Sequence, residues 1–241
     1  METAKLIFDF LGPDPTEMRQ FIHDVWPENP DANVLDLASG NGDHLFGFID
    51  KPVASVTVVD NSEEALRLLL ERHSNHKQLI SPICADLGTW ACDRKYDVVH
   101  MGDNSIQMFA SYKDQFNIIK TMASCLSDKG FGLLNVTPVT ERQIMEYCVE
   151  PKRITTVKNG GETVEVFGQI KVDVFNQDLI MYFSISRDGI EEGRSTCRCR
   201  MLLKHEIEEM VKAAGLKVVQ VRHRKLKRGN DSYYYLLQLN Q

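Results

Sequence analysis

The stretch Val34-Leu35-Asp36-Leu37-Ala38-Ser39-Gly40-Asn41-Gly42 joins an apolar run to a turn with two glycines. The apolar run predicts a buried strand at residues 33–37, and residues 44–49 begin a helix. Glycine lets the chain turn sharply and lets backbone approach a ligand closely. Because ligands of open α/β sheets bind at the carboxyl ends of the strands, we expect a ligand at this turn.

The spacing of the glycines indicates which ligand the turn can hold. Leu45 stands where a dinucleotide-binding G-x-G-x-x-G sequence would have its third glycine, which disfavours a dinucleotide. Asp36 lies four residues before Gly40, and a carboxylate there repels a phosphate and attracts an ammonium group. His44 follows the turn after Asp43 and is interpreted mainly as the start of the helix.

Strands and helices alternate on both sides of the turn, which predicts parallel pairing through right-handed crossovers. After Pro138 the pattern changes to consecutive strands, with a hairpin turn at residues 159–161. We therefore predict an α/β fold: a doubly wound, mostly parallel sheet with an antiparallel β insertion. The expected strands of the main sheet are residues 33–37, 55–59, 79–84, 96–101, 132–136, 216–222 and 233–239, with a turn at 128–130 before the fifth. The expected helices are residues 15–26, 44–49, 62–73, 112–126 and 204–214. The expected strands of the insertion are residues 153–157, 163–167, 170–176, 179–186 and 193–203.

Composition excludes several classes of protein. The formal net charge is -6 and the only locally basic segment is residues 222–228, so we expect no DNA partner. No signal-peptide pattern and no apolar run of membrane-spanning length occurs, so we expect a cytoplasmic protein without a membrane partner. Cys197 and Cys199 would share one face of a strand and could form half of a metal site, but no matching Cys/His pair stands out, so we expect no metal.

Further acidic residues follow the later strands in register with the glycine turn. Asp60 ends the second strand, 18 residues after Gly42, and Asp86-Leu87 follows the third strand. Together with Asp36, Gly40 and Gly42, this order resembles the class I S-adenosylmethionine-dependent methyltransferases, whose first motif is D/E-x-x-x-G-x-G. The resemblance covers residues 30–137 well and implies a seven-stranded Rossmann-like methyltransferase sheet.

The resemblance also implies how S-adenosylmethionine would bind. In the family, the acid at the end of the second strand binds both ribose hydroxyls, which a carboxylate can do because it accepts two hydrogen bonds at once. The polar residue after the third strand binds the adenine amino group, and its apolar neighbour contacts the ring. The expected cofactor-binding residues are Asp36, Ala38, Gly40, Gly42, Asp60, Asn61, Asp86, Leu87, Met101 and Arg19.

The segment after the fourth strand is expected to hold the methyl acceptor. It reads Gly102-Asp103-Asn104-Ser105-Ile106 and lacks the N/D-P-P-Y/F sequence of methyltransferases that act on nucleobase amino groups. It is similar instead to the G-N-S sequence of the glycine and sarcosine methyltransferase branch, whose insertion before the last helix also occurs in amino-sugar methyltransferases. Asp103 interrupts G-N-S, and Met108 stands where that branch commonly has a histidine. We expect Asn104, Ser105 and Met108 to bind substrate.

The expected reaction is in-line displacement of a methyl group onto a small molecule, most simply an amine nitrogen. A nucleophilic amine must be neutral, so a nearby group should accept its proton. Asp103 is the first candidate for that group, against an interpretation as a turn residue. His100 is the second, against an interpretation as a buried core histidine. The alternatives are an O-methyltransferase of a small metabolite, a protein or RNA methyltransferase, and a non-catalytic cofactor-binding subunit.

The expected organisation is a single methyltransferase domain at 1–241, acting as a monomer or homodimer. Residues 31–149 and 204–241 form its cofactor-binding core, and residues 150–203 form an insertion that covers substrate or joins subunits. Residues 1–30 form a helical region; Phe8, Phe10 and Arg19 lie where family members often have a lid over the cofactor.

Overall fold

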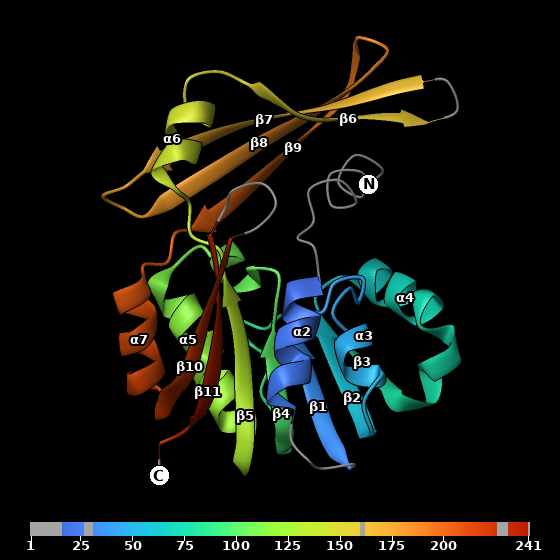
Figure 1. The fold of residues 1–241 in the computed structure, drawn as a ribbon, viewed down its shortest axis with the longest axis vertical. Coiled ribbons are helices and arrows are strands. Elements are labelled where there is room, and N and C mark those ends of the chain that lie inside the picture. Colours follow the sequence, from blue (N-terminus) through green and yellow to red (C-terminus); the bar gives the residue numbers. More distant parts are fainter. Residues whose placement is uncertain (1–15, 27–30, 160–161, 226–230, 241) are drawn as a thin grey trace. The chain divides into compact units, whose positions relative to one another are not determined.

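The chain forms a seven-stranded mixed sheet and a separate four-stranded antiparallel sheet (Figure 1). The computed structural model describes residues 16–26, 31–159, 162–225 and 231–240. Within these ranges, the chain forms two compact units. One contains residues 107–110 and 138–202, and the other contains the remaining described residues. None of the described helices has the length and apolar character needed to cross a membrane.

The seven-stranded sheet confirms the predicted fold class. Its strand order is β10-β11-β5-β4-β1-β2-β3, and the pairs among β1 to β5 are parallel, whereas β11 runs antiparallel to both β5 and β10. The strands are β1 (Ala32–Leu37), β2 (Val53–Asp60), β3 (Ile80–Cys84), β4 (Tyr96–Met101), β5 (Leu126–Val136), β10 (Leu216–Lys225) and β11 (Asp231–Leu239).

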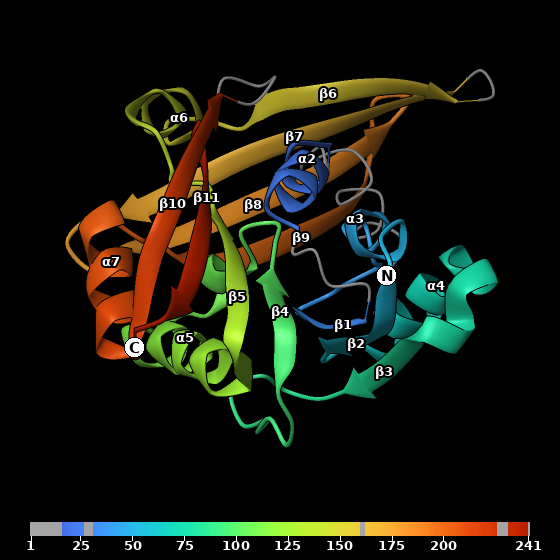
Figure 2. The same cartoon turned by 60° about the horizontal axis from the view of Figure 1, so that its bottom comes forward.

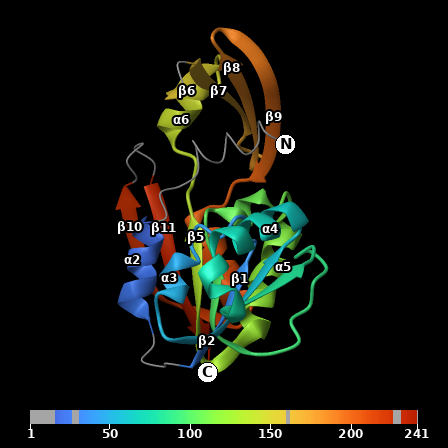
Figure 3. The ribbon, with the colours of Figure 1, turned by 90° about the vertical axis from the view of Figure 1, so that its right-hand side faces the viewer.

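Helices lie on both faces of this sheet, as Figure 3 shows for α2 and α3 on one face and α5 on the other. Such cover explains why the central strands are apolar on both sides: Val34, Leu35, Val58 and Val98 are all fully buried. The helices are α2 (Thr16–Val25), α3 (Phe46–Ile49), α4 (Glu63–Arg72), α5 (Tyr112–Cys125) and α7 (Lys204–Ala213), with short 3-10 turns η1 (Ser74–Leu79) and η2 (Ser105–Met108).

Serine caps place two of these helices where the sequence predicts them. The Ser62 hydroxyl accepts a hydrogen bond from the Ala65 amide at the start of α4, and the Ser111 hydroxyl accepts one from the Asp114 amide at the start of α5. A serine side chain thereby satisfies one of the free amides of the first helical turn. Phe8 and Phe10 of the predicted lid lie outside the described residues, whereas α2 is a helix as predicted.

The predicted turn at residues 128–130 is wrong, because these residues lie inside β5. Tyr96 pairs with Leu126, but Val98 pairs with Phe131, so β5 carries extra residues opposite β4 and forms a bulge. A side chain at Gly130 would lie only 2.9 Å from the Tyr96 carbonyl oxygen. The glycine therefore allows close approach of two strands instead of a change of direction.

The antiparallel sheet has the order β6-β7-β8-β9, with its strands side by side in Figure 2. Its strands are β6 (Lys152–Asn159), β7 (Glu162–Asp173), β8 (Asp178–Arg187) and β9 (Ile190–Arg200). They are preceded by helix α6 (Glu141–Tyr147), which was not predicted.

The insertion is antiparallel as predicted, but the predicted number of five strands is wrong. The predicted strands 163–167 and 170–176 form one strand, β7. Gly168 does not break it; a Cβ there would lie 2.4 Å from Ile154 Cδ1, so the glycine makes room for that side chain. Residues 160–161 of the predicted hairpin turn lie outside the described residues.

Candidate active site

The glycine turn after β1 contains two glycines, Gly40 and Gly42, whose surroundings differ. Ala38, Gly40 and Gly42 all have positive φ, at 53°, 52° and 79°. A Cβ at Gly42 would lie 2.8 Å from Leu69 Cγ and 3.0 Å from His73 Nε2, so this glycine is required by packing. A Cβ at Gly40 would have no atom of the described residues within 4 Å, so these residues leave open space there. The turn thus packs on one side and is open on the other.

Asp60 connects the turn to the end of the neighbouring strand β2. Its Oδ2 accepts a hydrogen bond of 2.8 Å from the Gly40 amide, and its Oδ1 accepts one of 2.9 Å from the Ser62 amide. Each carboxylate oxygen keeps further acceptor capacity. Two amides therefore hold a half-buried carboxylate beside the open space at Gly40.

These features fit S-adenosylmethionine. The Asp60 carboxylate is a suitable acceptor for ribose hydroxyls, and the exposed Asp86 is followed by buried Leu87, a polar and an apolar group side by side. The Ser39 hydroxyl oxygen is buried and has no hydrogen-bond partner among the described residues. A polar ligand could therefore approach the backbone at Gly40 and form a hydrogen bond with the Ser39 hydroxyl in the same turn.

Asp36 and His100 are predicted site residues that the structure pairs with each other. They are register partners on β1 and β4, and His100 Nδ1 lies 2.6 Å from Asp36 Oδ1. Both are buried, with 2% of Asp36 and 0% of His100 exposed. His100 Nε2 has no partner in the described part of the chain. Because His100 is fully buried, it is poorly placed to take a proton from a methyl acceptor. The Asp36 carboxylate binds the His100 ring.

Asp103 lies just after β4 and contacts a second histidine, His44. His44 Nε2 is hydrogen-bonded to Asp103 Oδ1, and the His44 side chain is 8% exposed while that of Asp103 is 32% exposed. Burial lowers the pKa of His44, but the charge and hydrogen bond of Asp103 outweigh it, so the net pKa is raised. The pair is therefore a buried imidazole that holds a partly exposed carboxylate.

The two histidine rings meet edge to face at Gly102. Their centroids are 5.3 Å apart with an interplanar angle of 70°. A Cβ at Gly102 would lie 2.7 Å from His100 Cε1 and 2.7 Å from His44 Cδ2, so only glycine fits between the rings. No local sequence pattern indicates the contact of His44 with Asp103, because the two residues are 59 positions apart.

A network from β5 and β11 supports the unusual backbone after Gly102. Asp103 and Asn104 have φ of 51° and 59°, in the left-handed region, which aspartate and asparagine adopt more readily than other non-glycine residues. The Asn104 amide donates to Asn135 Oδ1 at 3.1 Å, and Asn104 Oδ1 accepts from the Thr137 amide at 2.8 Å. Asn135 Nδ2 in turn donates to Ser232 Oγ at 2.7 Å. No sequence pattern indicates Asn135, Thr137 and Ser232, whose network holds Asn104, the residue next to Asp103.

The other predicted site residues occupy varied surroundings. Met101 is fully buried at the end of β4, and Asn61 is exposed directly after β2. The Arg19 guanidinium donates to the Asp43 carbonyl oxygen and lies 4.9 Å from the centre of the Phe46 ring, next to the glycine turn. The Ser105 amide bonds to the Gly102 carbonyl oxygen. Met108 belongs to the other compact unit, where it contacts Cys197 and Cys199.

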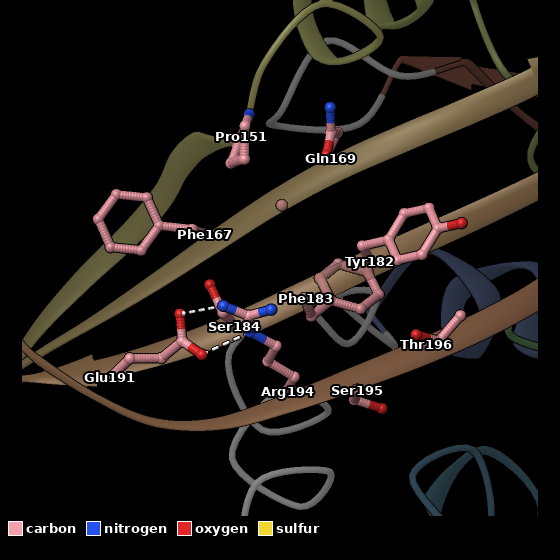
Figure 4. Close-up of a pocket in the computed structure, with 11 residues that line it drawn as sticks. Pro151, Phe167, Gln169, Tyr182, Phe183, Ser184, Glu191, Arg194, Ser195 and Thr196 are labelled. Atoms are coloured by element: carbon pink, nitrogen blue, oxygen red, sulfur yellow. Dashed lines mark hydrogen bonds and ion pairs between the residues drawn. The ribbon is translucent and has the colours of Figure 1, made fainter.

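A hollow of about 260 Å³ lies on the antiparallel sheet (Figure 4). Phe167 of β7 and Tyr182 of β8 contribute aromatic rings, and an ion pair between Glu191 and Arg194 forms part of the lining. This lining contains no residue predicted to bind cofactor or substrate. The predicted catalytic residues and, apart from Arg19 on α2, the predicted cofactor-binding residues lie at or just after the carboxyl ends of β1 to β4.

Comparison with known proteins agrees with this geometry. The chain matches a family described as "Methyltransferase domain" over residues 34–130, which include the glycine turn and the segment at Asp103. No curated protein sequence matches the chain.

Solved structures show the same fold at low sequence identity. An S-adenosylmethionine-dependent methyltransferase from Clostridium acetobutylicum ATCC 824 is 18% identical with a TM-score of 0.79, over 99% of this chain and 98% of that one. The CcbJ methyltransferase from Streptomyces caelestis is 19% identical with a TM-score of 0.77, over 98% and 95%. CalS10, an amino pentose methyltransferase from Micromonospora echinaspora, is 15% identical with a TM-score of 0.71, over 92% and 89%.

Proposed function

We propose that this S-adenosylmethionine-dependent methyltransferase methylates an amine nitrogen of a small molecule, with Asp103 as the group that receives the amine proton. The predicted enzyme class and methyl donor are confirmed by the methyltransferase domain at residues 34–130 together with the fold. The acceptor, its reacting atom and the roles of individual residues form the proposal.

The observation that carries the proposal is the placement of Asp103. Its carboxylate is partly exposed at the end of β4, the buried His44 holds one of its oxygens, and the Asn104–Asn135 hydrogen bond supports its backbone. A carboxylate in this place attracts an ammonium group and accepts a proton when the amine becomes the nucleophile. Either action selects for an amine.

The bound donor supplies an activated methyl group on a sulfonium, so the protein needs no covalent chemistry of its own. Its residues act by holding the two reactants in line, and such positioning can contribute about 7–11 kcal/mol to lowering the barrier. Asp60 and the glycine turn hold the donor side in this proposal, and Asp103 with His44 orients the acceptor. The network through Asn104 and Asn135 keeps that carboxylate in one position.

Two further observations support the proposal: one disfavours a nucleic-acid acceptor, and the other favours methylation of nitrogen. The net charge of -6 does not favour a nucleic acid. Structures of similar fold include a sugar N-methyltransferase, KedS8, from Streptoalloteichus sp ATCC 53650 and a glycopeptide N-methyltransferase, MtfA.

The test uses the full chain, isotope-labelled S-adenosylmethionine and cell extract separated by molecular size. We expect label in the small-molecule fraction, in products whose methyl group is bound to nitrogen by mass spectrometry. The Asp103→Asn variant should lose this transfer, whereas Asp50→Asn, a matched change at an exposed carboxylate after α3, should not. Label only in protein or RNA, or only on oxygen, would overturn the proposed acceptor. Tight donor binding with no transfer to any fraction would overturn the proposed catalysis.

A further inference from the structure

Three sulfur atoms meet in the unit that contains the antiparallel sheet. Cys197 Sγ lies 3.4 Å from Met108 Sδ, Cys199 Sγ lies 3.5 Å from the same atom, and the two thiol sulfurs are 3.5 Å apart. The atoms therefore form a nearly equilateral triangle. None of these three residues lines the hollow on the sheet.

Two separate parts of the chain produce the triangle. Cys197 and Cys199 are two residues apart on β9, so both side chains project from the same face of the sheet. Met108 ends the 3-10 turn η2 and belongs to the same compact unit. Cys199 is 2% exposed, whereas Met108 is 48% exposed, so the triangle has one buried and one open corner.

The size of the triangle suits a metal ion in its plane. The centre of a triangle with these sides lies about 2.0 Å from each corner, and metal–thiolate bonds are about 2.3 Å long. Each sulfur would need to move outward by only about 0.3 Å, which the flexible Met108 side chain and the two cysteine rotamers allow.

The chemistry of the three ligands selects the metal. Thiolates and thioethers are soft ligands that favour copper(I) over magnesium, calcium or manganese. A structural zinc site would need four ligands from cysteine, histidine or carboxylates, and no cluster of three or more such residues occurs among the described residues. Methionine, which zinc sites rarely use, supplies the third ligand here.

We propose that Cys197, Cys199 and Met108 bind one copper(I) ion in a three-coordinate, all-sulfur site. Binding replaces the thiol protons of the two cysteines, which pass to solvent, and leaves the oxidation state of copper unchanged. The expectation that the chain binds no metal rested on a missing partner for the cysteine pair, and Met108 is that partner.

The test measures copper(I) binding to the purified full chain without oxygen, with ascorbate to keep the metal reduced and a chromophoric copper(I) chelator as competitor. We expect one equivalent of copper to bind, and X-ray absorption should show three sulfur neighbours. Cys197→Ser and Cys199→Ser should each weaken binding at least 100-fold, and Met108→Leu at least tenfold. Zinc should compete poorly.

Matched variants in the same unit separate this site from general thiol binding. Cys148→Ser removes another free cysteine, and Met145→Leu changes an exposed methionine, so both should bind copper as the unchanged chain does. Far-ultraviolet circular dichroism verifies that each variant is folded. Equal affinity in the Cys197→Ser/Cys199→Ser double variant, or loss of binding only in Cys148→Ser, would overturn the proposal. The readout is independent of methyl transfer, so it stands apart from the proposed function.

Discussion

The imidazole of His44 is hydrogen-bonded through Nε2 to Oδ1 of Asp103, across 59 residues of sequence. His44 follows the glycine turn at β1, whereas Asp103 follows β4, and these parallel strands are neighbours in the sheet. The bond therefore ties the turn proposed to hold the methyl donor to the carboxylate proposed to face the acceptor. It fixes the position of the carboxylate and supplies a positive partner when His44 is protonated.

Replacing Asp103 by asparagine should remove the proton acceptor while keeping the shape of the side chain. We expect kcat to fall by about 10²–10⁴-fold, the usual contribution of a general base. Calorimetric affinity for S-adenosylmethionine should stay within about twofold, because Asp103 is not among the proposed donor-binding residues. Unchanged kcat in Asp103→Asn would contradict the assignment.

Stability should depend on pH through His44, because its pKa is raised above the ordinary value of 6.5. A raised pKa in the folded protein means that the folded state binds the proton more tightly than the unfolded state. The added stability is therefore complete below pH 6.5 and is lost as pH rises through the raised pKa. Urea unfolding at several pH values should show the free energy of unfolding of the unchanged chain falling in this window, relative to His44→Asn. A difference between the two proteins that does not vary with pH would argue against a charged His44.

Removing the Asp60 side chain should weaken donor binding. Hydrogen bonds to a charged group contribute about 1.5–3 kcal/mol, so Asp60→Ala should raise the dissociation constant of S-adenosylmethionine by about 10–100-fold. Asp60 also accepts from two amides of the turn, and Asp60→Asn, which keeps the side-chain length, serves as the milder comparison. Calorimetry that finds the same affinity in Asp60→Ala would place the ribose elsewhere.

The two glycines of the turn should respond differently to alanine. Gly42→Ala should lower the free energy of unfolding by about 2–4 kcal/mol, because overpacking against Leu69 and His73 adds to the cost of a positive φ. Gly40→Ala should cost only about 1–2 kcal/mol, since its surroundings are open, but it should weaken donor binding. Chemical denaturation and calorimetry of both variants measure the two effects. Equal destabilisation, with donor affinity intact in both, would contradict the division of roles.

Loss of the Asn135 side chain should act on Asp103 from a distance. Asn135→Ala removes the acceptor of the Asn104 amide and one of the two partners of the Ser232 hydroxyl, which keeps Thr137 Oγ1, and should cost about 1–3 kcal/mol of stability. The backbone at Asp103 and Asn104 should then lose part of its support, so kcat should fall more than KM changes. If kcat stays the same in a folded Asn135→Ala protein, the network is structural only.

Local sequence was sufficient for the elements whose pattern is continuous. The apolar runs of β1, β2 and β4 and the helical patterns of α4 and α5 each depend on neighbours within a few residues, and these elements are found where the sequence predicts them. Local pattern failed at Gly130 and Gly168, where glycine was interpreted as a turn or a break. Both glycines serve packing against another strand, and such a contact leaves no mark on the flanking residues.

The sequence by itself determined the sheet, the glycine turn and the order of Asp36, Asp60 and Asp86, because strand periodicity and turn chemistry are local properties. Only the tertiary structure decided which side chains act together. It paired Asp36 with His100 and His44 with Asp103, and it brought Met108 to Cys197 and Cys199 from about 90 residues away. The physical reason is that a hydrogen bond or sulfur contact needs atoms within a few ångströms. Parallel strands with long crossovers create such proximity for the two histidine–carboxylate pairs, and the packing of the unit that contains the antiparallel sheet creates it for the three sulfurs.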